Sequence, residues 1–199
     1  IFRIFDALND TRNMALAMRI AKREGAHVQA AISYTISPVH SIDLYLQIAH
    51  ELADLGADSL CIKDMAGMLS PKDAHDIITA FKKKTGLPVQ LHCHYTSGMA
   101  LMTYLRACDA NVDVLDTAFS PLGGGTSQPP VETIVAALRK TPRDPKLDME
   151  LLVEIANYFK ELREKFYDPL HLIDPLAERI DTSILVHQIP GGMFSNLIS

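Results

Sequence analysis

Short apolar runs alternate with amphipathic stretches along the first 140 residues of the chain. Five of these runs have the length and composition of strands, and they cover residues 1–6, 27–34, 58–64, 88–95 and 112–118. Their spacing of roughly 25 to 30 residues is typical of a strand followed by a helix. This alternation predicts a parallel sheet covered by helices, either as an open doubly wound sheet or as a (β/α)8 barrel.

The length of the chain favours part of a barrel. A complete barrel of about 250 residues gives each strand–helix unit about 31 residues, so about three units are missing here. The chain also begins at Ile1 inside an apolar run and without Met, which favours a fragment. We therefore predict an α/β fold in which residues 1–140 form a partial TIM barrel of about five βα units. Residues 141–199 are expected to add a long helix over 148–165 and the start of a further module.

Composition and charge exclude several classes of protein. With 48% hydrophobic and 22% charged residues, the chain is neither disordered nor fibrous. A net charge of −5 gives no field that would attract nucleic acid. Neither a long apolar run nor a signal-peptide pattern is found, and the three cysteines lack a CxxC spacing. These features predict a cytoplasmic protein without a disulfide framework.

Two histidines indicate a metal site. In both parallel architectures the carboxyl ends of the strands form the functional edge. His92 and His94 lie two residues apart within the run 88–95, which would point both imidazoles to one face at the spacing of metal ligands. The alternative is a pair of polar core residues with backbone partners.

Two basic residues on strands are candidates for metal binding and for substrate binding. Lys63 ends the run 58–64, and a buried ammonium must be paired or lose its proton. A neutral amine can take up carbon dioxide and become a carbamate, which is an oxygen ligand for a cation. An ion pair of Lys63 with Asp64 or another acid is the alternative. Arg3 could hold the carboxylate of an acidic substrate, or it could form a structural ion pair with Asp6.

A glycine-rich loop, SPLGGGTSQPP, follows the last predicted strand. Its three glycines would let backbone approach a ligand, next to the hydroxyls of Thr126 and Ser127. The loop lacks the GK[ST] ending of a phosphate-binding loop. Capping of the next helix by Ser127 and a simple turn at Thr126 are the alternatives.

Six motifs in this order strongly resemble the biotin-dependent carboxyltransferase domain, which pyruvate carboxylase, transcarboxylase and the α subunit of oxaloacetate decarboxylase share. The motifs are FRIFDALND, AAISYTISPVH, CIKDMAG, LHCHYTSGMA, GTSQPP and HQIPGGM. Within the family, SYTISPVH and HYTSGMA are most similar to the oxaloacetate decarboxylase α subunit or to the stand-alone B subunit of pyruvate carboxylase.

The resemblance implies a TIM barrel that binds a divalent metal, which is zinc, cobalt or manganese, at its carboxyl-terminal mouth. Lys63, as a carbamate, and His92 and His94 match three of the family's metal ligands. The fourth ligand is an aspartate in an RDxxQ motif that this chain does not contain. Arg3 matches the arginine that binds the keto-acid carboxylate. Thr126 matches the threonine that moves a proton between biotin and the methyl group of pyruvate.

These matches lead to a main interpretation and three rival ones. The chain is interpreted as a carboxyltransferase that decarboxylates oxaloacetate to pyruvate with carboxyl transfer to biotin. One rival is a pyruvate carboxylase subunit that makes oxaloacetate from pyruvate. A metal-dependent acyl-CoA lyase or synthase is the second, and a chain that only scaffolds partner subunits is the third.

The resemblance also bears on partners. The chain has no MKM-type biotinyl lysine, so biotin is expected on a separate domain or subunit. A homodimer is implied, as are membrane β and γ subunits that would couple decarboxylation to sodium export and hold the protein at the inner membrane. We expect the isolated 199 residues to be inactive and prone to aggregation, because an incomplete barrel has an exposed sheet edge.

Overall fold

The computed structural model describes residues 1–172 and 174–189, and it confirms the predicted α/β fold. Five parallel strands form one sheet in sequence order. They are β1 (Phe2–Phe5), β2 (Val28–Ser33), β3 (Ser59–Asp64), β4 (Val89–Cys93) and β5 (Val114–Leu115). Each strand of this partial barrel lies inside the run that was predicted for it.

Helices follow the strands. They are α1 (Thr11–Arg23), α2 (Ile42–Asp54), α3 (Pro71–Thr85), α4 (Ala100–Asp109), α5 (Val131–Leu138), α6 (Met149–Leu162) and α7 (Ile184–His187). Ser41 and Ser70 cap α2 and α3, because their hydroxyls accept bonds from amides of the first turn of each helix. Ser127 does not cap α5, which begins after Pro130 without a side-chain cap.

The chain forms two compact units. The first consists of residues 1–65, 69–93 and 102–115, which include all five strands. The second consists of residues 66–68 and 94–101 and the described residues from 116 onward. The second unit therefore gathers loops that follow β3, β4 and β5 together with the C-terminal part of the chain. The predicted boundary at residue 140 remains a prediction.

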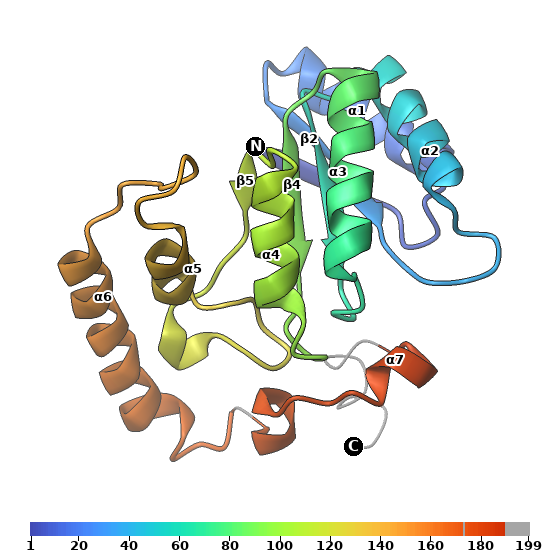
Figure 1. Ribbon diagram of the computed structural model, residues 1–199. Coiled ribbons are helices and arrows are strands. Elements are labelled where there is room, and N and C mark those ends of the chain that lie inside the picture. The colour runs from blue at the N-terminus through green and yellow to red at the C-terminus, as the bar shows by residue number, and fades with distance from the viewer. Residues whose placement is uncertain (173, 190–199) are drawn as a thin grey trace. The chain divides into compact units, whose positions relative to one another are not determined.

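One face of the sheet in the first unit is apolar. Alternate residues of β2 and β3 point to this face and are buried, for example Ala30, Ile32 and Ile62. Because strands in sequence order are joined by right-handed crossovers, the connecting helices lie on the same side of the sheet. Helix α1 contacts β1 and β2, α2 contacts β2, and α3 contacts β4. Each helix buries its apolar side chains, and Figure 1 shows how the helices lie along the sheet.

The opposite face of the sheet carries polar residues. Pairing between strands places Arg3 beside Gln29, and Lys63 beside His92. These side chains extend from the face that the helices leave uncovered, which is the interior face in a closed barrel. The predicted site residues of the first unit therefore share one face.

A side chain continues the hydrogen bonding between β1 and β2 beyond the end of β1. Asn9 donates from its amide nitrogen to the carbonyl oxygen of Ser33 at 2.9 Å, and its amide oxygen accepts from the Ser33 N–H at 2.7 Å. Asn9 has a φ of 59°, a left-handed conformation that asparagine adopts more readily than most residues. The carboxamide thus replaces a backbone partner for the last residue of β2.

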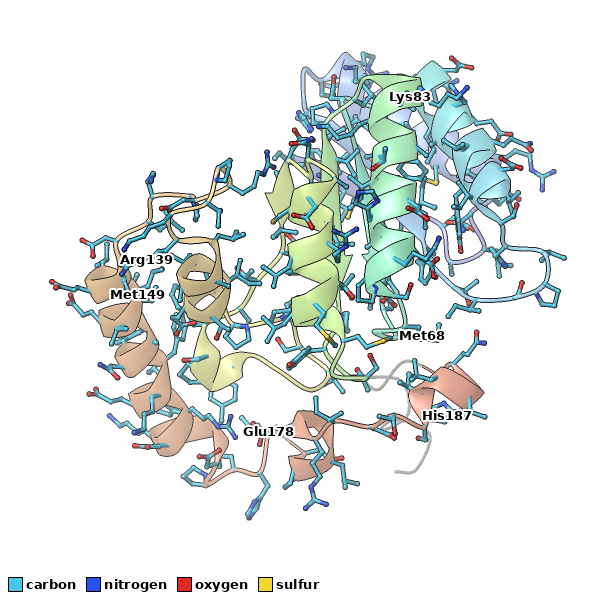
Figure 2. All side chains as sticks on the ribbon, viewed as in Figure 1. Met68, Lys83, Arg139, Met149, Glu178 and His187 are labelled. Atoms are coloured by element: carbon cyan, nitrogen blue, oxygen red, sulfur yellow. The ribbon has the colours of Figure 1, made fainter. Side chains whose placement is uncertain are left out.

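Apolar contacts join distant segments of the second unit. Met68, labelled in Figure 2, is buried with Ala66 and with Ile184 of α7. Phe119 stacks on Phe159 of α6, with ring centres 5.3 Å apart. The helix predicted over 148–165 is confirmed by α6. The last motif, HQIPGGM, is described only at its first three residues, and its part from residue 190 onward lies outside the described residues.

All five strands are shorter than the predicted runs, and β4 and β5 differ most. β5 covers only two residues, because Ala118 turns to bond with the backbone of Pro129 and Val131 instead of with the sheet. β4 ends at Cys93, so His94 begins the following loop. Across the described residues, no helix is long and apolar enough to cross a membrane.

Candidate active site

Lys63 and His92 lie next to each other at the carboxyl ends of β3 and β4. They are register partners on neighbouring parallel strands, which lie about 4.8 Å apart. Both side chains are partly buried. Two of the three predicted metal ligands are therefore adjacent on the polar face of the sheet.

Lys63 does not pair with Asp64, because consecutive strand residues point to opposite faces. The Asp64 carboxylate is fully buried on the apolar side, where it accepts bonds from the amide of Leu69 at 2.7 Å and from the thiol of Cys93 at 3.2 Å. The Nζ atom of Lys63 instead lies 3.6 Å from the centre of the Phe5 ring.

Burial lowers the pKa of Lys63 from its ordinary value; Cys61 offsets part of this effect, and the positive charge of Arg3 adds a smaller lowering. Removal of water from around an ammonium favours the neutral amine. Only the neutral amine can react with carbon dioxide. The local environment of Lys63 therefore favours the chemistry that the carbamate requires.

Arg3 belongs to a row of polar side chains on the same face. Its Nε atom donates to the amide oxygen of Gln29 at 2.6 Å, and the Gln29 amide donates in turn to Gln90 at 2.8 Å. The carboxylate of Asp6 accepts bonds from the loop after β1, including the amide of Leu8 at 2.8 Å. Arg3 is thereby oriented by an amide from β2.

The sequence pattern did not single out Gln29 and Gln90. A signal for Gln90 was present, since it precedes His92 by two residues on the same strand and so shares its face. Gln29 is 4% exposed and interrupts an otherwise apolar strand. Such a residue indicates a buried polar partner, but the partner comes from strands far along the chain and cannot be found by local pattern.

The expectation that His92 and His94 point the same way stays a prediction. β4 ends at Cys93, so His94 lies one residue past the strand and belongs to the second unit. Its Nδ1 atom is 2.5 Å from the backbone carbonyl oxygen of Thr126. A carbonyl oxygen only accepts hydrogen bonds, so Nδ1 must carry the proton. A neutral ring in this tautomer has Nε2 as its metal-binding atom.

Thr126 is held through its backbone on two sides within the second unit. Its N–H donates to the carbonyl oxygen of Ala177 at 2.7 Å, and its carbonyl oxygen accepts from His94. The neighbouring N–H of Tyr95 donates to the carbonyl oxygen of Ser127 at 2.8 Å. The loop with Thr126 and the loop with His94 are therefore joined by backbone contacts.

The chemistry of the predicted ligand set is compatible with a divalent metal on one condition. Within residues 1–172 and 174–189, no three His, Cys, Asp or Glu side chains form a group that could hold a metal ion. The predicted set has only two histidines, and its third member, Lys63, becomes an oxygen donor only after reaction with carbon dioxide. The lowered pKa of Lys63 and the tautomer of His94 both suit that set.

Comparison with known proteins places the chain in a family. The sequence profile of the HMGL-like family matches residues 7–159. The chain belongs to the HMGL-like family. It is 56% identical over 199 residues to the B subunit of pyruvate carboxylase from Methanothermobacter thermautotrophicus, a match that covers the whole chain and 34% of that protein.

Two further similar proteins are named for carboxyl transfer. The methylmalonyl-CoA carboxyltransferase 5S subunit of Propionibacterium freudenreichii is 44% identical over the whole chain and 39% of its own length. The carboxyl transferase domain from Rhizobium etli pyruvate carboxylase is 36% identical, with a TM-score of 0.90 over 99% of this chain and 33% of that one. The chain thus spans roughly a third of these relatives.

These similarities confirm the resemblance to biotin-dependent carboxyltransferase domains. They do not support the oxaloacetate decarboxylase and the pyruvate carboxylase interpretations equally. Pyruvate carboxylases and their separate B subunits recur among the relatives, which favours a pyruvate carboxylase subunit over an oxaloacetate decarboxylase α subunit.

Proposed function

We propose that this HMGL-like chain is the carboxyltransferase part of a biotin-dependent pyruvate carboxylase. In this reaction a carboxyl group moves from biotin to pyruvate and gives oxaloacetate. The observation that carries the proposal is Lys63, whose pKa is lowered and which lies in register with His92 on the polar face of the sheet. The names of the similar proteins support the same conclusion.

In this proposal Lys63, as a carbamate, and His92 and His94 hold a divalent metal, with zinc, cobalt and manganese as the candidates. The metal would supply positive charge for the enolate oxygen that forms on pyruvate. The Nδ1–H bond of His94 to the Thr126 carbonyl keeps the ring in the tautomer that binds a cation. Lys63 contributes a negative oxygen ligand where the sequence has an amine.

Arg3 binds the carboxylate of pyruvate. A guanidinium offers two parallel N–H groups that match a carboxylate, and the bond from Nε to Gln29 fixes the plane of the group. Gln29 is itself held by Gln90. The keto acid would thus be oriented by β1 and β2, beside the strand ends with Lys63 and His92.

Thr126 moves a proton. As the carboxyl group leaves biotin, the methyl group of pyruvate loses a proton and forms a C–C bond, while the biotin nitrogen gains a proton. The Thr126 hydroxyl accepts the first proton and donates its own to biotin in one relay, since a hydroxyl is a poor acid in water. The position of Thr126 therefore matters more than its pKa. Biotin would arrive on a separate domain or subunit.

The reverse direction is the second candidate, as in an oxaloacetate decarboxylase α subunit, and the motifs SYTISPVH and HYTSGMA favour it. The same residues would serve, since Thr126 would then return a proton to the enolate. Membrane β and γ partner subunits, coupling to sodium export and attachment at the inner membrane belong to this candidate. A homodimer is proposed for both directions.

Substitution of Lys63 in the complete protein tests the proposal. We expect Lys63→Ala to lose bound metal, measured by mass spectrometry of the metal content, and to lose at least about a hundredfold in biotin-dependent carboxyl transfer. The matched control is Lys83→Ala, an exposed lysine of α3 that is labelled in Figure 2. Full activity of Lys63→Ala would contradict the proposal.

A substrate panel separates carboxyl transfer from acyl-CoA chemistry and from a scaffolding role. The unaltered complete protein is assayed with oxaloacetate and free biotin, with pyruvate and carboxylated biotin, and with acyl-CoA substrates. Turnover that depends on biotin supports carboxyl transfer. Cleavage or synthesis of acyl-CoA without biotin would favour a lyase or synthase, and absence of all three activities would favour a scaffolding role.

A further inference from the structure

A short C-terminal segment of the second unit holds the backbone of Thr126. The segment consists of residues 174–181 and contains a turn of 3-10 helix, Pro175–Glu178. The carbonyl oxygen of Ala177 in this segment accepts the N–H of Thr126 at 2.7 Å. With His94 bonded to the Thr126 carbonyl, both backbone polar groups of Thr126 have partners on opposite sides.

The same segment also contacts the loop that follows β4. The N–H of Asp181 donates to the carbonyl oxygen of Thr96 at 2.8 Å. The hydroxyl of Thr96 in turn donates to the carbonyl oxygen of Gly125, next to Thr126, at 3.4 Å. Segment 174–181 therefore bonds to the loop with His94 and to the loop with Thr126.

The approach of this segment to the glycine-rich loop is close enough to exclude a side chain. A Cβ atom at Gly125 would clash with the carbonyl oxygen of Ala177, and Gly125 has a φ of 49°. Both the contact and the left-handed conformation favour glycine at this position. The glycine that precedes Thr126 thus serves the contact with the C-terminal segment.

An ion pair fixes segment 174–181 to the rest of the second unit. Arg163, just after α6, lies 2.5 Å from a carboxylate oxygen of Glu178, and its Nη1 atom also donates to the carbonyl oxygen of Pro121 at 2.7 Å. Pro121 lies at the start of the loop that leads to Thr126. Glu178, which Figure 2 labels, follows Ala177 directly in sequence.

The ion pair joins a partly buried arginine to a glutamate that is 38% exposed. Arg163 is only 23% exposed and also contacts Asp168, so the guanidinium has several acceptors. The hydrogen bond from Arg163 lowers the pKa of Glu178, which keeps the carboxylate charged. A network with a carbonyl and two carboxylates holds its geometry better than an isolated exposed pair does.

We infer that Arg163 and Glu178 are positioning residues for Thr126: their ion pair holds segment 174–181 against the glycine-rich loop, and the Ala177 carbonyl then fixes the Thr126 backbone. This inference rests on the proposed role of Thr126 in carboxyl transfer. A proton relay between two bound partners is sensitive to displacements of about 1 Å, which can cost about a hundredfold in rate. Arg163 and Glu178, which follow Thr126 at a distance in the sequence, would therefore control the rate of the chemical step.

The test compares Glu178→Gln, Glu178→Asp and the control Glu154→Gln, an exposed glutamate of α6, in the complete protein. For Glu178→Gln we expect kcat for carboxyl transfer to fall by about 10- to 100-fold, with KM for pyruvate and metal content within about twofold of the unaltered protein. Glu178→Asp should recover part of kcat, and Glu154→Gln should leave kcat unchanged. With Arg163→Gln measured in parallel, the double variant should lose less than the two single losses combined, because the two residues share one ion pair.

A second measurement does not depend on activity. Hydrogen exchange of the Thr126 amide, whose N–H bonds to Ala177, should become faster in Glu178→Gln and stay unchanged in Glu154→Gln. Unchanged exchange and unchanged kcat in Glu178→Gln would overturn the inference, as would equal losses of kcat, pyruvate binding and metal. Thr126→Val is measured in parallel: if it keeps full transfer activity, the proposed function fails, whereas faster exchange in Glu178→Gln would still support the positioning contact.

Discussion

The Nζ atom of Lys63 lies over the ring of Phe5, 3.6 Å from its centre, on the face of the sheet that also carries His92. An aromatic face attracts a cation, so this contact by itself favours the ammonium. Burial and the charge of Arg3 act in the opposite direction, and the pKa of Lys63 is lowered overall. The apolar ring therefore acts mainly by excluding water from the amine.

Metal uptake should depend on carbon dioxide if Lys63 binds metal as a carbamate. We expect metal-free complete protein in carbon dioxide-free buffer to take up zinc, cobalt or manganese weakly, and added bicarbonate to raise the bound fraction to nearly one metal per site. Lys63→Ala should show no response to bicarbonate. The measurement is metal content after gel filtration, and uptake that is equal with and without bicarbonate would argue against a carbamate ligand.

Arg3→Lys should weaken binding of the keto acid. A lysine keeps the positive charge but loses the fork of N–H groups and the Nε bond to Gln29. Loss of a charged hydrogen bond costs about 1.5–3 kcal/mol, so KM for pyruvate should rise by roughly 10- to 100-fold. Steady-state kinetics measure the change, with Arg19→Lys, an exposed position on α1, as control. An unaltered KM would remove Arg3 from the substrate site.

Substitution of Thr126 should separate chemistry from binding. Thr126→Val keeps the shape of the side chain and both backbone bonds but lacks the hydroxyl. We expect carboxyl transfer to fall by about 10²- to 10⁴-fold, with metal content and pyruvate binding unchanged, because a general acid–base step is lost. Thr126→Ser restores a hydroxyl and should recover much of the rate. A valine variant with normal turnover would exclude the proton relay.

Stability at the opposite end of the strands should depend on pH through Asp58. The bond from Lys22 lowers the pKa of Asp58, and the bond from the Val28 amide adds to this effect. A carboxyl group with a lowered pKa in the folded state stabilises the fold above its unfolded pKa, and this contribution is lost as pH falls through the folded pKa. Asp58→Asn should therefore unfold more easily than the unaltered protein at pH 7.

The pH dependence of this difference is the critical observation. Chemical denaturation at several pH values should show that the gap between Asp58→Asn and the unaltered protein narrows steadily below about pH 4. Asp54→Asn, at an exposed position at the end of α2, is the matched control and should show a small gap at every pH. A constant gap for Asp58→Asn would mean that the charge of Asp58 does not stabilise the fold.

The strands could be predicted from sequence because their signals are local. Apolar runs, helix caps such as Ser70 and the left-handed Gly86 at the end of α3 mark the elements independently of their partners. The same runs located Lys63 and His92, since a strand end in a parallel sheet lies at the functional edge. The alternation of faces along a strand also excludes an ion pair between Lys63 and Asp64, which point to opposite sides of the sheet.

Other features depend on contacts between distant residues. No local pattern indicates that His94 leaves the strand to bond with the Thr126 carbonyl, or that Ala177 lies beside Gly125. The row of Arg3, Gln29 and Gln90 likewise joins residues from three strands. Such contacts depend on the tertiary structure, whereas hydrophobic periodicity predicts only helices and strands.

The carboxamide of Asn9 attaches the loop after β1 to the end of β2, next to the bond from the Ser33 hydroxyl to the Asp6 carbonyl oxygen. One side chain satisfies both backbone groups of Ser33, so loss of that carboxamide would leave these two groups without this partner. Asp6 and Asp10 carry further bonds of the loop. Tolerance to substitution should therefore be low at Asn9 and high at the exposed Leu8.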